Sequence, residues 1–475
     1  MPLAAWLKQG RDSKSPPFKV NWVLRNHLQP TAPLLLKIHF TRNASTTFLG
    51  RLNVATLTDR QTRLSQRAAR TQVPAISGLV AKPLEDPEII SLAAGLVDHQ
   101  SLPFEEVREV LNRIFDSNDT AKNSLQYGTT IGYNALRKSL AERLESKGVA
   151  APVNPNHIAV TSGSQQLLFL ASEVLLDPGD IVLVEDPTYF VYLGALEAIG
   201  ARVIGVATDN DGLIPEALEQ RLEELKAADE ISRVKILYLL TYYQNPRGTS
   251  IPWSRREKIY EIVQRYTADS YIYILEDAAY VDLRYDGPEI PLMKTLDPDN
   301  ERIILAMTFS KGFSPGLRIG YGYLPEELVQ PVLSQKGNQD FGTSNFAQYI
   351  AYHALASGYF DEHGKIVRER YRRKRDVMLK VIREEFPKEV SYIEPDGGLY
   401  VWATLPEGIS TSPGSKFFDE ALARKVIYVP GAYCYAQEPG ITKPDNQLRL
   451  CYGYIEEQPM IEGLRRLAAA LKTCV

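Results

Sequence analysis

Short apolar runs alternate with amphipathic segments over the middle of the chain. Runs such as "IVLVED" (181–186) and "VKILYLL" (234–240) are almost continuously apolar, which is typical of strands buried on both faces of a parallel sheet. Segments such as "PEALEQRLEELKAA" separate them and place apolar residues at helical spacing. The pattern predicts an α/β domain whose parallel or mixed sheet has helices on both faces. The predicted strands are 157–163, 181–186, 202–208, 234–240, 271–277, 302–310 and 317–324.

The pattern changes beyond about residue 345. The stretch "GKIVRERYRRKRDVMLKVIREEF" has helical periodicity and many charges, and such a run usually marks the solvated face of a helix rather than a basic binding patch. Short strands and a closing helix, "IEEQPMIEGLRRLAAALK", follow it. They predict a smaller α+β domain. The predicted boundaries are 1–56 for a disordered basic extension, 57–104 for a segment joining the small domain, 105–345 for the large domain and 346–475 for the small domain.

Composition narrows the class of protein. A chain of 475 residues with 44% hydrophobic and 24% charged residues fits a soluble globular protein of more than one domain. Its net charge of -4 gives no argument for nucleic-acid or membrane partners, and no apolar run approaches the roughly 18 residues that span a bilayer. Cys434, Cys451 and Cys474 show no metal-ligand spacing and suit free thiols in a reducing compartment. We therefore expect a cytoplasmic protein without a metal site.

The first 56 residues differ from the rest in charge. They contain eight Lys or Arg residues and a single acidic residue, Asp12. They lack a small-residue cleavage site after an apolar core, which argues against a secretory signal. A disordered extension, or a start codon assigned too far upstream, is favoured over an organelle transit peptide.

Polar residues gather where the predicted strands end. The endings are "TSGSQQ", "EDPTYF", "TYYQNPRG", "EDAAY" and "TFSKG". Each alone has an ordinary explanation as a helix cap or a turn. Together they bring hydroxyls, Asn, Asp, Tyr and Lys to the edge of the sheet at which parallel α/β proteins bind ligands. The most specific stretch, "TFSKGFSPGLRIGY", holds Lys311 behind Thr308 and Ser310, with Arg318 seven residues later.

The order and spacing of these segments resemble fold-type I pyridoxal-phosphate enzymes. Within them the chain most resembles the class I/II aminotransferases of the 2-aminoadipate, kynurenine and broad-specificity branch. The likeness runs from about residue 60, through "IISLAAGLVDHQSLP" and "LQYGTTIGYNALRKSL", over more than four-fifths of the chain. It implies an aspartate-aminotransferase-like fold, in which a three-layer large domain with a mostly parallel sheet accompanies a smaller α+β domain.

The resemblance also implies a reaction. With pyridoxal 5'-phosphate as cofactor, an amino group would move from an aromatic, branched or 2-aminoadipate-like L-amino acid to a 2-oxo acid such as 2-oxoglutarate, by a ping-pong mechanism. Lys311 would bond to the cofactor aldehyde and move a proton. Asp277 would pair with the pyridine nitrogen, Asn245 and Tyr280 would bind the phenolic oxygen, and Tyr189 would stack on the ring.

The remaining implied roles concern the phosphate and the substrate. Tyr127 matches a tyrosine that reaches the phosphate of the neighbouring subunit, which implies a homodimer. Arg449 would grip the α-carboxylate of the substrate, with Asn245 beside it and Gly95 letting backbone approach. The residues implied to hold the phosphate are Gly163, Ser164, Gln165, Thr308, Ser310 and Arg318.

Two departures and three alternatives accompany the resemblance. "NPRG" places Arg247 where the family usually has Thr, and Ala94 stands where Gly is common; both bear on substrate range rather than cofactor use. A carbon–sulfur β-lyase would share the lysine motif. A transcriptional regulator would need a helix-turn-helix domain upstream, for which residues 1–56 are too short. A nicotinamide-dependent dehydrogenase is disfavoured because "GLRIGYG" lacks the GxGxxG order.

Overall fold

The computed structural model describes residues 64–73 and 75–474. All the described residues lie after residue 56. The expectations for residues 1–56, a disordered extension or a transit peptide, therefore lie outside the described residues.

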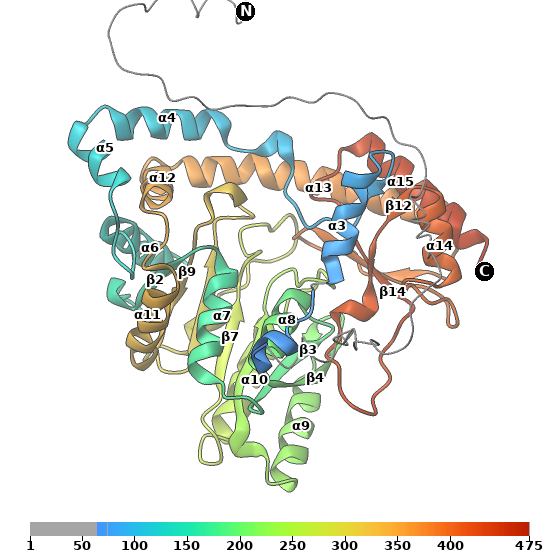
Figure 1. Cartoon of the computed structure of the whole chain (residues 1–475), viewed down its shortest axis with the longest axis horizontal. Helices are drawn as coiled ribbons and strands as arrows, with labels where there is room; N and C mark the ends of the chain where they lie inside the picture. The colour runs from blue at the N-terminus through green and yellow to red at the C-terminus, as the bar shows by residue number, and fades with distance from the viewer. Residues whose placement is uncertain (1–63, 74, 475) are drawn as a thin grey trace, which may run out of the picture. The chain divides into compact units, whose positions relative to one another are not determined.

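An eight-stranded sheet lies at the centre of the described chain (Figure 1). β3, β4, β6, β7 and β8 run parallel, β9 is antiparallel to both of its neighbours, and β5 is antiparallel to β4. All seven predicted strands are present, which confirms the mostly parallel sheet. In spatial order the strands are β2 (Ile158–Thr161), β9 (Gly320–Tyr323), β8 (Ile303–Thr308), β7 (Tyr273–Asp277), β6 (Val234–Leu240), β3 (Ile181–Asp186), β4 (Arg202–Asp209) and β5 (Gly212–Leu213).

Helices cover both faces of this sheet because successive strand residues point to opposite sides. Val182 and Val184 pack in one apolar cluster with α7 (Ser164–Leu175), α8 (Phe190–Ile199) and α11 (Glu326–Asp340). Ile181 and Leu183 pack in another with α9 (Pro215–Ala227) and α10 (Trp253–Arg265). The result is the three-layer arrangement predicted from the buried strands.

The remaining helices of the large domain pack beside α12. That helix contacts α4, α5, α6 and α13, and α4 and α12 run near each other at the top of Figure 1. Two short N-terminal helices precede them. The bounds are α2 (Gln66–Arg70), α3 (Ala75–Glu85), α4 (Phe104–Phe115), α5 (Asn118–Leu125), α6 (Asn134–Ser146), α12 (Asn345–Ala356) and α13 (Tyr359–Glu385).

A second, four-stranded antiparallel sheet belongs to the C-terminal part, with α15 packed on α13. Beside it β1 pairs with β12 in parallel, so residues 90–91 join the C-terminal part. The domain boundaries themselves stay a prediction. The elements are β1 (Ile90–Ser91), β10 (Ser391–Tyr392), β11 (Tyr400–Thr404), β12 (Val426–Ile427), β13 (Val429–Pro430), β14 (Gln447–Cys451), α14 (Lys416–Ala423) and α15 (Glu457–Lys472).

Most charged side chains of helix α13 are exposed, as the sequence predicts, but two of its cations are not. Lys374 and Arg375 are buried, and Lys374 Nζ donates to Asp98 Oδ1 at 2.9 Å. Arg370 also pairs with Asp98. Burial opposes ionisation of Asp98, but hydrogen bonds from Arg370 and Lys374 outweigh it and lower the pKa of the carboxyl. The charge pattern did not indicate these two buried positions, because cations can be buried where a carboxylate distant in the sequence compensates them.

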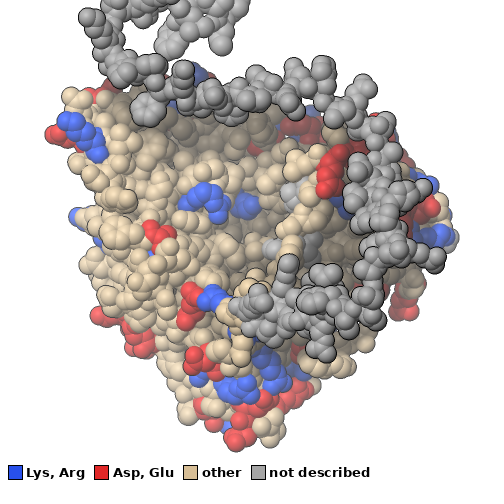
Figure 2. Space-filling model, in the orientation of Figure 1, with Lys and Arg blue, Asp and Glu red and all other residues tan. Residues whose placement is uncertain are grey.

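Surface charge is mixed on the face shown in Figure 2. Basic and acidic side chains alternate around α9 at the lower end of the view, where Arg265 and Glu219 join α10 to α9 at 2.7 Å. Such exposed pairs contribute less than about 1 kcal/mol each. Within the described residues no helix is long and apolar enough to cross a membrane, and no His, Cys, Asp and Glu cluster could hold a metal ion.

Candidate active site

The register of the central sheet brings the predicted strand ends together. Leu240 at the end of β6 lies beside Asp277, which lies beside Ala306 of β8. Thr308, at the end of β8, pairs with Gly320 of β9. The segments that follow β6, β7 and β8 therefore begin at one edge of the sheet, as the sequence predicts.

Asp277 is a buried carboxylate without a cationic partner among the described residues. Its oxygens accept hydrogen bonds from the Tyr238 hydroxyl (2.9 Å) and the Ala279 N–H (3.1 Å). Burial raises the pKa of Asp277 to about 6, although these two hydrogen bonds act in the opposite direction. A cationic pyridine N–H would supply the missing partner and keep the carboxylate ionised. Tyr238 escaped prediction because it sits inside the apolar run of β6.

Lys311 follows β8, and its Nζ donates to the carbonyl oxygen of Gly95 at 3.0 Å. The side chain is partly exposed, but protein atoms surround the amine closely. Burial, helped by the charges of Arg449 and Arg318 and opposed by Cys451, lowers the pKa of Lys311 to about 8. A larger fraction of the amine is then neutral and nucleophilic at neutral pH than in an ordinary lysine. The structure therefore argues against the reading of Lys311 as an ordinary surface lysine.

The start of α7 has the features of an anion-binding site. Gly163 has φ 78°, and no side chain caps the helix within the described residues, so its first N–H groups remain free for a ligand. A Cβ at Gly163 would meet Arg318 Nη2 at 2.9 Å. The Thr308 hydroxyl donates to Ser310 Oγ at 2.9 Å. The residues brought together around this helix start are Gly163, Ser164, Gln165, Thr308, Ser310 and Arg318.

Two further observations concern this helix start. Gln165 Oε1 is buried without a hydrogen-bond partner in the described chain, but it is an acceptor and does not itself favour an anion. A Cβ at Gly320 would come within 2.4 Å of the Ser164 backbone nitrogen, so β9 packs directly on the helix start. The donor set, a helix N-terminus with two hydroxyls and a guanidinium, suits a phosphate.

Arg449, on β14, is almost fully buried rather than on a solvent face. Its Nη1 donates to Asn245 Oδ1 at 2.7 Å and its Nη2 to the Ala93 carbonyl at 2.8 Å. Its Nε is buried without a partner, and no carboxylate pairs with it in the described residues. A buried cation without a counter-charge is costly. The site therefore favours an anionic ligand such as a carboxylate.

Aromatic side chains line the space between these groups. Tyr189 stands immediately before α8, and burial raises its pKa above the ordinary value. The Tyr280 hydroxyl lies 3.1 Å from that of Tyr400. Tyr400 was missed at the sequence level because "GGLYVW" marked only a strand.

Tyr127 is not brought to this site. Its side chain is 84% exposed, and its ring packs edge-on against Phe341 with centroids 5.8 Å apart. The role implied for it needs a second subunit, so it stays a prediction.

The two departures from the family pattern lie close to the site. Ala94 stands between Ala93, whose carbonyl binds Arg449, and Gly95, whose carbonyl binds Lys311. Arg247 Nη2 donates to Asn210 Oδ1 at 3.4 Å, and burial lowers the pKa of its guanidinium. Neither residue displaces a predicted cofactor-binding group.

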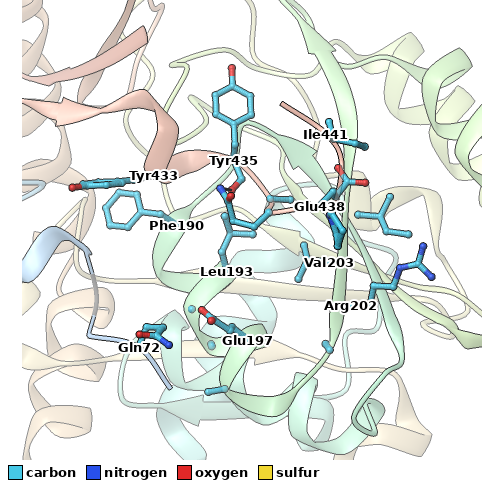
Figure 3. A pocket seen from close by; sticks show the side chains of 18 of the residues that line it. Gln72, Phe190, Leu193, Glu197, Arg202, Val203, Tyr433, Tyr435, Glu438 and Ile441 are labelled. Carbon is cyan, nitrogen blue, oxygen red and sulfur yellow. Dashed lines mark hydrogen bonds between the residues drawn. The ribbon is translucent and has the colours of Figure 1, made fainter. Parts of the chain in front are cut away.

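A cavity of about 980 Å³ lies next to the site, between α8, β4, α9 and the segment 432–441 (Figure 3). Phe190, Leu193 and Val203 contribute apolar side chains to its lining, and Glu197 and Arg202 contribute charged ones. Of the predicted site residues only Gln165 reaches it. The cavity therefore adjoins the candidate active site but is not the site itself.

The fold and these residues define a fold-type I enzyme that uses pyridoxal 5'-phosphate. The chain belongs to the aminotransferase class I and II family, whose model matches residues 87–467. It is therefore an aminotransferase. The resemblance drawn from the sequence is confirmed, as are the fold class and the cofactor, and the comparisons give no support to the β-lyase alternative.

Individual relatives agree with this assignment. The aromatic-amino-acid aminotransferase 1 of Thermococcus litoralis is 35% identical over 87% of this chain and 95% of its own. The 2-aminoadipate transaminase of Thermus thermophilus is 33% identical over 85% and 95%. The crystal structure of Pyrococcus horikoshii kynurenine aminotransferase in complex with PMP superposes with a TM-score of 0.81 at 34% identity, covering 88% of this chain and 99% of that one.

Proposed function

We propose that this aminotransferase transfers the amino group of an aromatic, branched or 2-aminoadipate-like L-amino acid to a 2-oxo acid such as 2-oxoglutarate by a ping-pong mechanism. The buried, unpaired guanidinium of Arg449 carries this proposal. It contacts the carbonyl of Ala93, two residues from the Gly95 carbonyl that holds Lys311. A carboxylate on Arg449 would therefore place the adjoining amino-bearing carbon near the amine. The names of the relatives support the range of amino acids.

The cofactor-binding roles belong to the same proposal. When bound, pyridoxal 5'-phosphate supplies an electron sink that lets a proton leave the carbon bearing the amino group. Lys311 holds the cofactor and moves that proton, and Asp277 keeps the pyridine nitrogen protonated. Asn245 and Tyr280 bind the phenolic oxygen, and Tyr189 covers the ring. The phosphate is held by Gly163, Ser164, Gln165, Thr308, Ser310 and Arg318.

We further propose that the protein forms a homodimer and that it lies in the cytoplasm, which is a reducing compartment. We also propose that it acts in amino acid metabolism, including biosynthesis. Large apolar side chains are exposed on and around α4 and α5, and a second subunit would cover them. The partner's Tyr127 would complete the phosphate site. The three cysteines are all unpaired, which supports the compartment. The exposed apolar residues are Phe104, Phe115, Leu125, Tyr127 and Phe341.

The test follows the visible absorption of the purified protein loaded with pyridoxal 5'-phosphate. Phenylalanine, leucine and 2-aminoadipate should each bleach the band, and 2-oxoglutarate should restore it, because each half-reaction converts one form of the cofactor into the other. Alanine serves as the small-side-chain control. Pyruvate and ammonia release from an S-substituted cysteine, whose thiolate leaves from the β-carbon, without transfer to 2-oxoglutarate would contradict the proposal, as would a protein that gains no visible band.

A further inference from the structure

Tyr400, the first residue of β11, lies between the residues proposed to bind the cofactor and the substrate. It is 2% exposed. A Cβ at Gly95 would come within 2.7 Å of its hydroxyl, so that hydroxyl also borders the segment whose carbonyl holds Lys311. None of the roles given above uses Tyr400.

The hydroxyl of Tyr400 is committed to Tyr280. The two hydroxyl oxygens are 3.1 Å apart, and the rings meet edge to face with centroids 5.9 Å apart. Neither hydroxyl has another hydrogen-bond partner among the described side chains and backbone groups. A phenol hydroxyl donates one hydrogen bond and accepts others. If Tyr280 donates to the cofactor, its oxygen accepts from Tyr400.

The ring of Tyr400 contacts the substrate arginine. Trp402 pairs with Arg449 across β11 and β14, so Tyr400, two residues before Trp402, is a diagonal neighbour of Arg449 on the same face. The guanidinium carbon of Arg449 lies 4.3 Å from the centre of the Tyr400 ring. A cation held over an aromatic face at this distance is attracted by the ring. With Asn245 and Ala93, the ring fixes the plane of the guanidinium.

We propose that Tyr400 is a positioning residue, whose hydroxyl directs the Tyr280 proton toward the phenolic oxygen of the cofactor and whose ring holds Arg449 flat against the substrate carboxylate. One aromatic side chain thereby links the cofactor-binding and substrate-binding groups. The inference rests on the roles proposed for Tyr280 and Arg449.

Tyr400→Phe tests the hydroxyl in the cofactor-loaded enzyme. A hydrogen bond accepted by Tyr280 polarises its O–H and strengthens the bond that it donates. Without it the anionic phenolic oxygen is less stabilised, so the pH at which the visible band of the bound cofactor changes should rise by about 0.5 unit. Tyr428→Phe is the matched control. It removes another buried hydroxyl from the same domain, bonded to the Thr411 carbonyl at 2.9 Å, and should leave this pH unchanged.

The double variant shows whether Tyr400 acts through Tyr280. Tyr280→Phe alone should raise the pH midpoint further than Tyr400→Phe does, and adding Tyr400→Phe to it should cause no additional shift. An additive shift, or a Tyr400→Phe midpoint equal to that of the unmodified enzyme, would overturn the hydroxyl role. An unmodified protein without a visible band would instead overturn the cofactor assignment, and the inference with it.

Tyr400→Leu tests the ring. Loss of the aromatic face should raise the KM for the amino acid about fivefold, whereas Tyr400→Phe, which keeps the ring, should leave KM within about twofold of the unmodified value. Equal KM values for the two variants would overturn the ring role. If Tyr400→Leu does not fold, a KM raised more than twofold in Tyr400→Phe would overturn the ring role.

Discussion

Glu276 and Asp277 are consecutive residues at the end of β7, and their side chains point to opposite faces of the sheet. Glu276 belongs to what we call the structural cluster, formed with Arg256, Lys294 and Asp297. Asp277 belongs to the candidate active site, with Lys311 and Arg449. Each region holds an acid, a lysine and an arginine that are buried or partly buried, but the two regions satisfy these charges differently.

In the structural cluster every charged group has partners. Lys294 Nζ donates to Asp297 Oδ2 and to the Ile303 carbonyl, both at 2.7 Å. Arg256 donates from all three of its nitrogens to backbone carbonyls at 2.6 to 2.8 Å. Glu276 accepts from the Thr241 hydroxyl and two backbone N–H groups at 2.8 to 2.9 Å. Such a set contributes to the fold and leaves nothing for a ligand.

In the candidate active site the charged groups are bonded to neutral groups rather than to opposite charges. Asp277 and Arg449 have no opposite charge among the described residues, and the only hydrogen bond of Lys311 to a described residue goes to the Gly95 carbonyl. Burial alone does not identify a functional lysine, because burial lowers the pKa of Lys294 as well. What distinguishes Lys311 is the absence of a described carboxylate partner. The predictions below probe this difference.

The largest effect is expected for Lys311→Ala. Removal of the amine takes away both the covalent attachment and the proton carrier, so amino transfer should fall at least about 10⁴-fold. The phosphate and ring contacts remain, so the protein should still bind the cofactor. Steady-state kinetics and the absorption of the loaded variant measure the two properties. Lys226→Ala, an exposed lysine paired with Asp269, is the control, and activity near that of the control would assign the amine elsewhere.

Asp297→Ala tests the structural cluster. It leaves the ammonium of Lys294 buried without its carboxylate, which should lower the free energy of unfolding by about 3 to 5 kcal/mol. Asp269→Ala removes the partner of the exposed Lys226 and should cost less than about 1 kcal/mol. Denaturant unfolding of both variants measures the difference. Equal losses would mean that the buried pair is no more important than a surface pair.

Much of the fold was predictable because its signal is local. The buried strands β3 and β6 are continuous apolar runs with the bounds that the sequence predicts. The antiparallel direction of β9 was not predictable, since an apolar run carries no information on direction. The buried cations of α13 were also missed. Lys374 and its partner Asp98 are 276 residues apart, and charge alone does not indicate such a pair.

The candidate site, too, was predictable only where the sequence carries a recognisable signal. Lys311 and Asp277 were candidates because they follow apolar strands, whereas their roles and that of Arg449 were implied by the resemblance to the family. Tyr238 and Tyr400 were missed because an aromatic residue inside an apolar strand has the appearance of core, and only its hydrogen bond reveals another role. The role implied for Tyr127 needs a second chain, so neither the sequence nor a single subunit could test it.

Arg449→Ala extends the comparison to the arginines. It removes the anion-binding guanidinium from the site, so the KM for the amino acid should rise about 100-fold, with a smaller change in kcat and in stability. Arg256→Ala should lower the stability instead of raising the KM. It leaves three buried backbone carbonyls without their donors, so stability should fall while the KM of the folded enzyme stays unchanged. Steady-state kinetics and denaturant unfolding of both variants measure the KM and the stability. A KM that rises in Arg256→Ala but not in Arg449→Ala would assign substrate binding to Arg256 instead.

The smallest effect concerns the charge of Lys311 in the cofactor-free protein. The pKa of Lys311 is about 8 when folded, against 10.5 for an ordinary lysine. The unfolded chain therefore binds more protons between these two values, and stability rises with pH through this window. Below pH 8 the buried ammonium is a penalty, so Lys311→Met should stabilise the cofactor-free protein at pH 7 by about 1 kcal/mol, a value reduced for partial exposure. The gain should shrink as the pH approaches 10.5. Thermal unfolding at pH 7 and pH 10 measures it, and a gain that grows with pH would mean that Lys311 is stabilised as a cation.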